Sequence, residues 1–393
     1  MANDKKSLIP QIAILKRDDL PKGTTYLIRY ISYAITFTVA MIICTLVVND
    51  NYYNLVGYLV QGAFADIWKL LLNTSLLLAF GIAIVPTFKM KYWNMGANGQ
   101  VLVGTLVAIV IMFYTENFAK VSAFNNILVI LLMLVGSTIA SVIWAVIPSI
   151  FKVFFNTNET LFTLMMNYIA GGLVAYVNFV LAQGKKESPG IVNQTSKSGW
   201  LPKVFDTNYF IPILIITLMT VFVFFYMKKT KQGYEISVVG DSINTAKYVG
   251  MNTKKIIIRT IIVSGIICGI IGFLYASAIN QSIDKNTCGS LGFTAILVAW
   301  LANFNPIIMA GISFVLAFLT LGTSKVSSIY RLGNNDLSNV IIGLIFFAIL
   351  ISEFFIRFKL KFNEQNQLYI KVMKIKNKLL GKKHNGKEGV EEC

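Results

Sequence analysis

KKTKQGYEISVVGDSINTAKYVGMNTKK, residues 228–255, is the polar stretch that separates two strongly apolar segments in the middle of the chain. It carries six lysines and only two acidic residues. Residues 241–249 predict a short helix, because Asp241 or Ser242 can cap its N-terminus and Gly250 can end it in a left-handed conformation. Since a bare turn would suffice to join two membrane spans, we interpret this helix as a contact for another protein.

Outward from this stretch, the chain is apolar in both directions. Its 393 residues are 55% hydrophobic and only 13% charged, whereas a soluble protein is about a quarter charged. Apolar runs of about 20 residues, the length that crosses a bilayer, recur from end to end. These runs do not alternate as the strands of a transmembrane barrel would. The sequence therefore predicts an all-α, polytopic transmembrane helical bundle.

About ten spans are expected, within a range of eight to ten. They make up a permease domain at 30–356, between an N-terminal tail at 1–29, with a surface helix around 9–15, and a basic C-terminal tail at 357–393. The expected spans are 30–48, 68–88, 101–114, 127–147, 160–182, 209–227, 256–279, 291–304, 307–321 and 337–356.

The net charge of +17 is explained by topology. In a ten-span arrangement both tails and the 228–255 loop lie on one side, and most lysines and arginines fall there, as expected for the cytoplasmic side. The lysines of the 183–208 loop count against this arrangement. The bilayer, and no nucleic acid, is the partner that this charge predicts.

Two polar breaks lie beside short apolar helices, at 92–100 and 291–306. Broken or re-entrant helices leave backbone groups free, which is tolerated at membrane depth where those groups line a cavity. We interpret the breaks as corresponding elements of two repeats. The predicted solute path contains Asn94, Asn98, Gln100, Asn167, Tyr168, Phe293, Trp300 and Asn303.

Simpler roles for these residues stay open. The amides can form hydrogen bonds between helices without any ligand. The aromatic side chains can contact lipid or core instead of stacking on a base. Asn158 and Glu159 can cap the following span with no further function.

The chain offers little for catalysis. Its four cysteines are scattered and its only histidine, His384, lies in a polar tail, so we expect no catalytic residue, no metal and no cofactor. The segment GKKHNGK at 381–387 resembles a phosphate loop, but Glu388 follows where Ser or Thr must hold Mg²⁺. Energy must therefore come from a partner ATPase or an ion gradient. An ion-coupled secondary transporter is the alternative class, although intramembrane acids are scarce.

Four segments carry a resemblance to one family. WNMGANGQ at 93–100 is similar to its FNIGAEGQ, and NETLFTLMMNYIA at 158–170 to its NEVISTLMLNYIA. Residues 233–251 resemble its coupling loop, and LGFTAI at 291–296, followed by the Asn-Pro pair at 305–306, resembles its GFTAIAVALLG–NP segment. The family is that of the permease subunits of ATP-binding-cassette (ABC) importers for branched-chain amino acids, simple sugars and nucleosides.

The resemblance is closest to the nucleoside, guanosine-type permeases. Two departures stand out: Asn98 occupies a position where the family usually has Glu, and residues 242–245 lack the family's Asn-Pro pair. The resemblance implies a nucleoside as the small-molecule substrate, with a simple sugar or a branched-chain amino acid as alternatives. It also implies a transport subunit that is not itself an enzyme.

The resemblance further implies partners and a location. A cytoplasmic ABC ATPase drives transport, a second and different permease chain completes the channel, and an extracellular solute-binding lipoprotein delivers the solute. The chain is expected to be a multi-pass protein of a bacterial plasma membrane. The expected ATPase contact consists of Gly240, Asp241, Ala246, Tyr248, Gly250 and Met251.

Overall fold

The computed structural model describes residues 50–182 and 190–331 continuously, together with 12–16, 358–362 and isolated positions within 31–45 and 340–354. The chain forms two units, Met1–Leu55 with Asn339–Cys393, and Val56–Ser338. The spans expected at 30–48 and 337–356 therefore lie largely outside the described residues.

A two-stranded antiparallel sheet belongs to the first unit. Strand β1 (Ile12–Lys16) pairs with β2 (Phe358–Phe362), and Ile12 lies opposite Phe362. The surface helix expected around 9–15 is wrong from Ile12 onward. The segment FKLKF of β2 alternates apolar and basic residues with the period of a strand, and its partner lies near the other end of the sequence, where local patterns give no signal.

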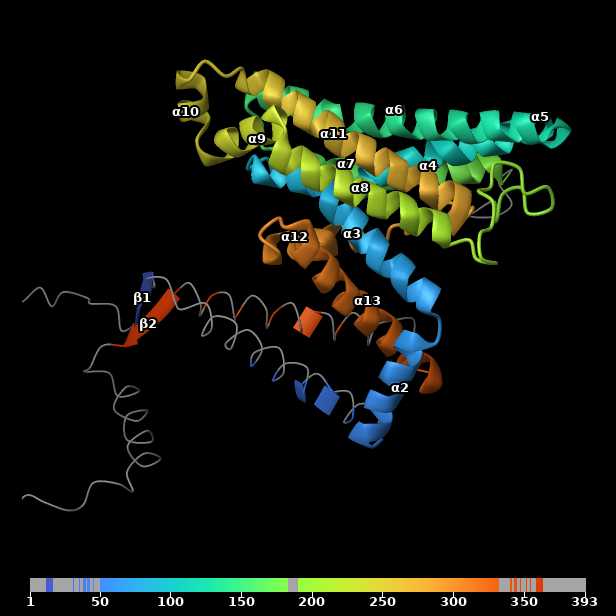
Figure 1. The fold of residues 1–393 in the computed structure, drawn as a ribbon, viewed down its shortest axis with the longest axis horizontal. Coiled ribbons are helices and arrows are strands. Elements are labelled where there is room, and N and C mark those ends of the chain that lie inside the picture. Colours follow the sequence, from blue (N-terminus) through green and yellow to red (C-terminus); the bar gives the residue numbers. More distant parts are fainter. Residues whose placement is uncertain are drawn as a thin grey trace, which may run out of the picture. The chain divides into compact units, whose positions relative to one another are not determined.

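The second unit is helical throughout its described elements. In chain order the helices are α2 (Tyr52–Phe64), α3 (Ile67–Lys89), α4 (Ala97–Tyr114), α5 (Glu116–Val121), α6 (Ala123–Phe155), α7 (Glu159–Leu181), α8 (Phe210–Lys229), α9 (Lys231–Asp241), α10 (Ile243–Tyr248), α11 (Thr253–Leu274), the π-helix η1 (Tyr275–Ile279), α12 (Leu291–Leu301) and α13 (Pro306–Ile329). Figure 1 shows α9 and α10 at one end of the bundle formed by α4, α6, α8 and α11.

Seven helices of the described chain are long and apolar enough to cross a membrane: α3, α4, α6, α7, α8, α11 with its π-helical end, and α13. They correspond to seven of the ten expected spans. The span expected at 291–304 contains only α12, which has 11 residues. Such a helix is about 16 Å long and cannot cross a hydrocarbon core of about 30 Å.

The surface of α6 is that of a helix in lipid. Every fourth residue along one face is apolar and more than half exposed, from Ile127 at 55% to Ile143 at 57%. In water this stripe would oppose folding, whereas lipid tails solvate it at no cost. The exposed stripe and the seven long apolar helices identify a multi-pass membrane protein.

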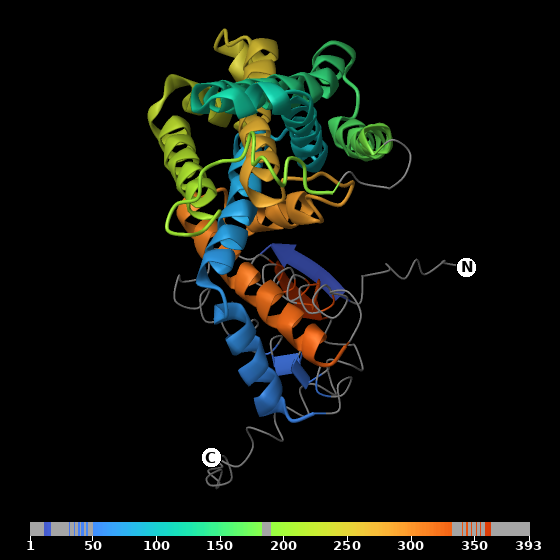
Figure 2. The same ribbon diagram turned by 90° about the vertical axis from the view of Figure 1, so that its right-hand side faces the viewer.

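Helix α11 lies at the centre of the bundle because glycines remove its side chains where it meets its neighbours. A Cβ atom at Gly269 would lie 2.5 Å from the Cα of Thr138 on α6, and one at Gly272 would lie 2.8 Å from the backbone nitrogen of Thr105 on α4. Gly265 makes the same close approach to Val142. Figure 2 shows α13 running beside α3.

Candidate functional site

The first predicted break, between α3 and α4, is held by its own amides. Asn94 and Gln100 are buried. The Oδ1 atom of Asn94 accepts hydrogen bonds from the backbone nitrogen of Gly96 at 3.0 Å and from Nε2 of Gln100 at 3.2 Å. Two of the predicted path residues are thus brought together, and they fix the turn that starts α4.

Asn167 clamps this break from α7. Its Nδ2 donates to the carbonyl oxygen of Met95 at 2.8 Å, and its Oδ1 accepts from the backbone nitrogen of Gly99 at 2.8 Å. One side chain therefore satisfies two backbone groups that the break leaves free. Its neighbour Tyr168 lies on the other face of α7 and is 72% exposed.

Asn98 joins the first break to the second. Its Nδ2 donates to the carbonyl oxygen of Gly289 at 3.1 Å, and its Oδ1 accepts from the backbone nitrogen of Gly292 at 2.9 Å. Gly292 has no room for a side chain, because a Cβ atom there would collide with Asn98. The structure therefore places the N-terminus of α12 against that of α4.

The aromatic residues near the second break occupy a partly exposed surface. Trp300 is 52% exposed and contacts Trp93 edge to face, with ring centroids 6.0 Å apart. Phe293 is 44% exposed. Asn303 has a φ of +47° in the turn between α12 and α13, where Asn305 then caps α13 by accepting from the backbone nitrogen of Ile307.

The capping role of Asn158 is confirmed. Its Oδ1 accepts from the backbone nitrogens of Thr160 at 3.0 Å and Leu161 at 3.2 Å. Glu159 forms an ion pair with Lys152 at 2.8 Å across the turn between α6 and α7. Both residues thus secure the start of α7.

The short helix predicted at 241–249 is present as α10. Ser242 is its N-cap and accepts from the backbone nitrogen of Thr245 at 3.2 Å, and Gly250 follows with a φ of +81°. The preceding helix α9 was not predicted. Thr230 caps it by accepting from the backbone nitrogen of Gly233 at 3.1 Å. We call α9 and α10 together the loop hairpin.

Two residues of the expected ATPase contact face the chain itself. Ala246 is fully buried in a core with Met90, Tyr92, Ile236 and Val239. Gly240 lies directly against the carbonyl oxygen of Lys89, at the end of α3. Their inclusion in an outward contact surface is therefore corrected: they attach the loop hairpin to α3.

The remaining residues of that expected contact are accessible to different degrees. Tyr248 is 94% exposed, Asp241 and Gly250 are exposed, and Met251 is partly buried against the same core. A partner can therefore reach the tip of the hairpin at 248–250. Val249, which is 65% exposed, joins that tip.

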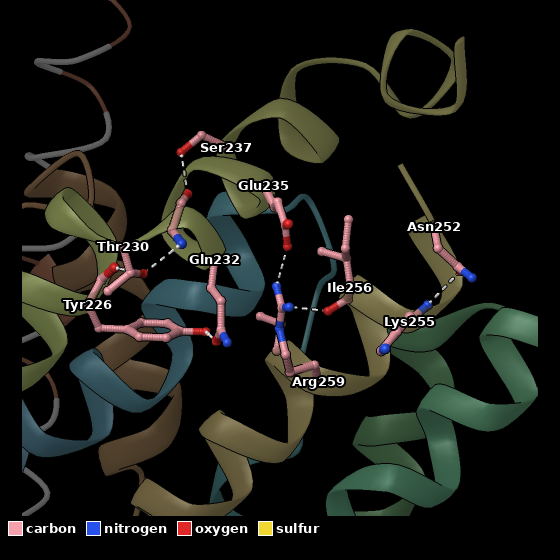
Figure 3. A network of polar contacts seen from close by, with 11 residues as sticks. Tyr226, Thr230, Gln232, Glu235, Ser237, Asn252, Lys255, Ile256 and Arg259 are labelled. Carbon is pink, nitrogen blue, oxygen red and sulfur yellow. Dashed lines mark hydrogen bonds and ion pairs between the residues drawn. The ribbon is translucent and has the colours of Figure 1, made fainter. Parts of the chain in front are cut away.

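The loop hairpin is also tied to α8 and α11 by polar contacts (Figure 3). Nη2 of Arg259 on α11 donates to Oε2 of Glu235 on α9 at 2.7 Å. The hydroxyl group of Tyr226 on α8 donates to Oε1 of Gln232 at 3.0 Å. These side chains come from three helices and hold α9 in place.

A pocket of about 390 Å³ lies at the opposite ends of α3 and α11. It was missed by sequence reasoning, because its wall combines segments separated by more than two hundred residues. The predicted path residues do not line it, although Gly289, the hydrogen-bond partner of Asn98, does. The lining residues are Lys69, Leu72, Asn73, Leu76, Tyr209, Tyr275, Ile279, Asn280, Asn286, Thr287, Cys288, Gly289 and Leu291.

Comparison with known proteins gives a consistent answer. The family model described as "Branched-chain amino acid transport system / permease component" matches residues 64–350. The chain is 26% identical to the guanosine ABC transporter permease protein NupP of Bacillus subtilis, over 63% of this chain and 69% of that protein. It is 24% identical to the nucleoside ABC transporter permease protein NupB of Lactococcus lactis, with the same two coverages.

A third relative is named for a sugar. The chain is 22% identical to the glucose ABC transporter permease protein TsgB13 of Haloferax volcanii, over 74% of this chain and 77% of that protein. No solved structure matches the chain. Because the family model covers most of the sequence, and the bundle supplies the membrane spans that such a subunit needs, the chain belongs to the permease component family of the branched-chain amino acid transport systems.

Proposed function

We propose that this ABC permease subunit carries nucleosides across a bacterial plasma membrane. The relatives NupP and NupB, named for guanosine and for nucleosides, support the substrate class. In this proposal the loop hairpin and both tails face the cytoplasm. A cytoplasmic ABC ATPase supplies the energy, a second and different permease chain completes the channel, and an extracellular lipoprotein delivers the solute.

The observation that carries the proposal is the attachment of the loop hairpin. Its tip at 248–250 is exposed, while its base is fixed to α3 through Gly240 and to α11 through Glu235 and Arg259. A partner that moves the tip therefore moves the cytoplasmic ends of two membrane helices. Nucleotide binding in the ATPase would change the path by this connection, which fits alternating access between two orientations of a bundle.

The amide cluster of the first break stays the predicted wall of the path. Nδ2 of Asn94 and Oε1 of Gln100 are buried and have no hydrogen-bond partner among the described residues. They form one spare donor and one spare acceptor, which the base edge or ribose hydroxyl of a nucleoside can satisfy when the path opens. Tyr168, Phe293, Trp300 and Asn303 remain proposed parts of the same path.

Cross-linking tests the ATPase contact. A Tyr248→Cys variant, in a chain whose native cysteines are serines, is co-expressed with the ATPase and treated with a bifunctional thiol reagent. We expect a permease–ATPase adduct. The matched control is Phe205→Cys, which is 70% exposed but lies in the loop before α8. Equal adduct formation by both variants, or none by Tyr248→Cys, would contradict the docking role.

Competition tests the substrate. Uptake of labelled guanosine by the reconstituted complex should be inhibited by adenosine and uridine but unaffected by glucose or leucine. A simple sugar is the second candidate, because one relative is named for glucose. Uptake of labelled glucose by a complex that takes up no labelled guanosine would replace the first candidate by the second.

A further inference from the structure

The pocket at the far ends of α3 and α11 has the size and position of a binding site. Its volume of about 390 Å³ lies in the range of small-molecule sites, roughly 300–1,000 Å³. The wall is built by the first turns of α3, the residue that precedes α8, the π-helix, the loop that begins at Asn280, and Leu291, the first residue of α12.

The polar groups of this wall are available to a ligand. The side-chain amides of Asn73, Asn280 and Asn286 form no hydrogen bond among the described residues, although each amide can donate and accept. The ring of Tyr209 adds an aromatic face, and the side chains of Leu72 and Leu291 add apolar surface. Such a mixture suits a molecule that combines hydroxyl groups with a flat ring.

The charge of the wall narrows the ligand class. Of the described residues that line the pocket, Lys69 alone is charged. An amino acid needs an anionic partner for its ammonium group, and the wall provides none. A neutral solute avoids this requirement, and its donors and acceptors can pair with the three amides.

The backbone of the wall is unusual where it meets the pocket. Residues Tyr275–Ile279 form a π-helix, a rare conformation that is frequently found at functional sites. The loop before α8 holds it: Leu201 donates from its backbone nitrogen to the carbonyl oxygen of Ser277 at 3.0 Å, and Val192 donates to that of Gln281 at 2.9 Å. The π-helix is therefore fixed beside the pocket.

The same two helices connect the pocket to the loop hairpin. Helix α3 lines the pocket at Lys69–Leu76 and meets Gly240 at Lys89, whereas α11 pairs with Glu235 near its start and ends in the π-helix. Figure 1 shows the hairpin at one end of α11 and the loop before α8 at the other. A movement of the hairpin would thus reshape the pocket.

We propose that this pocket is a solute site within a single permease chain and that it binds a neutral nucleoside. The three amides hold the ribose hydroxyls and the base edge, and Tyr209 lies against the ring. The inference rests on the proposed function for its choice of nucleosides as probes. This site is distinct from the amides of Asn94 and Gln100 in the first break. Asn98 connects the two, because its Nδ2 donates to the carbonyl oxygen of Gly289 in the pocket wall.

Protection from labelling tests the site directly. Asn286, which is exposed and lines the pocket, is replaced in an Asn286→Cys variant of a chain with Cys44, Cys268, Cys288 and Cys393 changed to serine. The reconstituted complex is treated with a membrane-impermeant thiosulfonate reagent. We expect guanosine, adenosine or uridine to slow the labelling at least 5-fold. Leucine and glucose should have no effect.

The control Phe205→Cys lies in the loop before α8, outside the pocket, and its labelling should not respond to nucleosides. Unprotected labelling of Asn286→Cys in a complex that still takes up guanosine would overturn the pocket and leave the proposed function intact. Protection by glucose or leucine alone would overturn the nucleoside class. Protection of both cysteines alike would also overturn the pocket, because it would show a general change of shape.

Kinetics supply an independent readout. Asn73→Leu and Asn280→Leu should each raise the KM for guanosine about 5-fold, as expected for one lost hydrogen bond, and leave the maximal rate within 2-fold. The matched control is Thr74→Val, since the hydroxyl group of Thr74 bonds to the carbonyl oxygen of Leu70 and does not line the pocket. An unchanged KM in both leucine variants would contradict the site.

Discussion

Arg259 and Glu235 form an ion pair of 2.7 Å between α11 and α9, and both side chains are largely shielded, with 29% and 16% exposed. The pair joins a helix that is expected to cross the membrane to a hairpin that projects from the bundle. It is a connection by charge, whereas the contact of Gly240 with Lys89 is a connection by backbone packing. The two together fix both the distance and the orientation of the hairpin.

Glu235→Gln should weaken the first connection. A hydrogen bond to a charged group contributes about 1.5–3 kcal/mol, and partial exposure of the pair reduces this to about 1 kcal/mol of unfolding free energy. We expect the variant to retain basal ATP hydrolysis in the reconstituted complex and to transport less guanosine per ATP. The measurement is the ratio of uptake to hydrolysis.

The control for this variant is Glu116→Gln. Glu116 pairs with Lys120 at 2.7 Å, but with 31% and 46% of the side chains exposed, and outside the loop hairpin. Glu116 also accepts from the hydroxyl group of Ser196 at 2.9 Å, a hydrogen bond that glutamine can keep. The variant should leave the uptake ratio unchanged. An unchanged ratio in Glu235→Gln would show that the ion pair does not transmit movement.

Gly240→Ala should detach the hairpin from α3. The new Cβ atom would collide with the carbonyl oxygen of Lys89, and overpacking of this kind costs about 1–3 kcal/mol. Thermal denaturation in detergent should show the loss, and trypsin should cleave the loop at 228–255 faster. Gly171→Ala on α7 is the control, since no atom of the described residues lies within 4 Å of its added Cβ atom. Equal behaviour of the two variants would contradict the close packing.

Asn98→Leu should separate the two breaks. The variant loses the hydrogen bonds to Gly289 and from Gly292 and leaves the buried backbone nitrogen of Gly292 unpaired, at a cost of about 1–3 kcal/mol. Asn125→Leu should cost far less, because the one side-chain hydrogen bond of Asn125 among the described residues, to the carbonyl oxygen of Phe118, is exposed. The unfolding free energies of both variants in detergent provide the test, and similar values would refute the role of Asn98.

Tyr92→Phe should stabilise the protein or leave it unchanged. The hydroxyl group of Tyr92 is buried and has no hydrogen-bond partner among the described residues, so its removal relieves an unpaired polar atom worth about 1 kcal/mol. Burial raises the pKa of Tyr92, and the carboxylate of Glu159 raises it further.

The pH dependence follows from the direction of that shift. The neutral phenol is favoured in the folded state, so stability is complete below the ordinary tyrosine pKa of about 10 and falls as the pH rises above it. Tyr92→Phe should lose less stability in alkali than the unaltered protein. Tyr248→Phe, at an exposed position, should behave like the unaltered protein, and a reduced alkaline loss there would contradict the assignment to Tyr92.

Local signals explain why α10 could be predicted and α9 could not. The cap at Ser242 and the left-handed Gly250 lie within one short segment. Helix α9 contains Gly233 and Gly240, which argue against a helix when read alone. The structure requires both residues to lack side chains, because each lies against the backbone of a neighbouring segment.

The candidate site also contains features that could be predicted from the sequence and features that could not. The amides of Asn94, Asn98 and Asn167 could be singled out as polar groups in apolar surroundings, and the cap at Asn158 follows from its neighbours. The partners of Asn98 are 191 and 194 positions away along the chain. Contacts of that separation, and the pocket wall that they support, depend on tertiary packing that a single sequence does not reveal.

The three glycines of α11 have a consequence for the transport cycle. Backbone lies against backbone at Gly265, Gly269 and Gly272, so at these three positions no flexible side chain separates α11 from its neighbours. We therefore expect helices α4, α6 and α11 to move together. The changes of shape during transport should then occur where α3 and α12 contact these three helices. An inhibitor that binds at those contacts should stop the cycle.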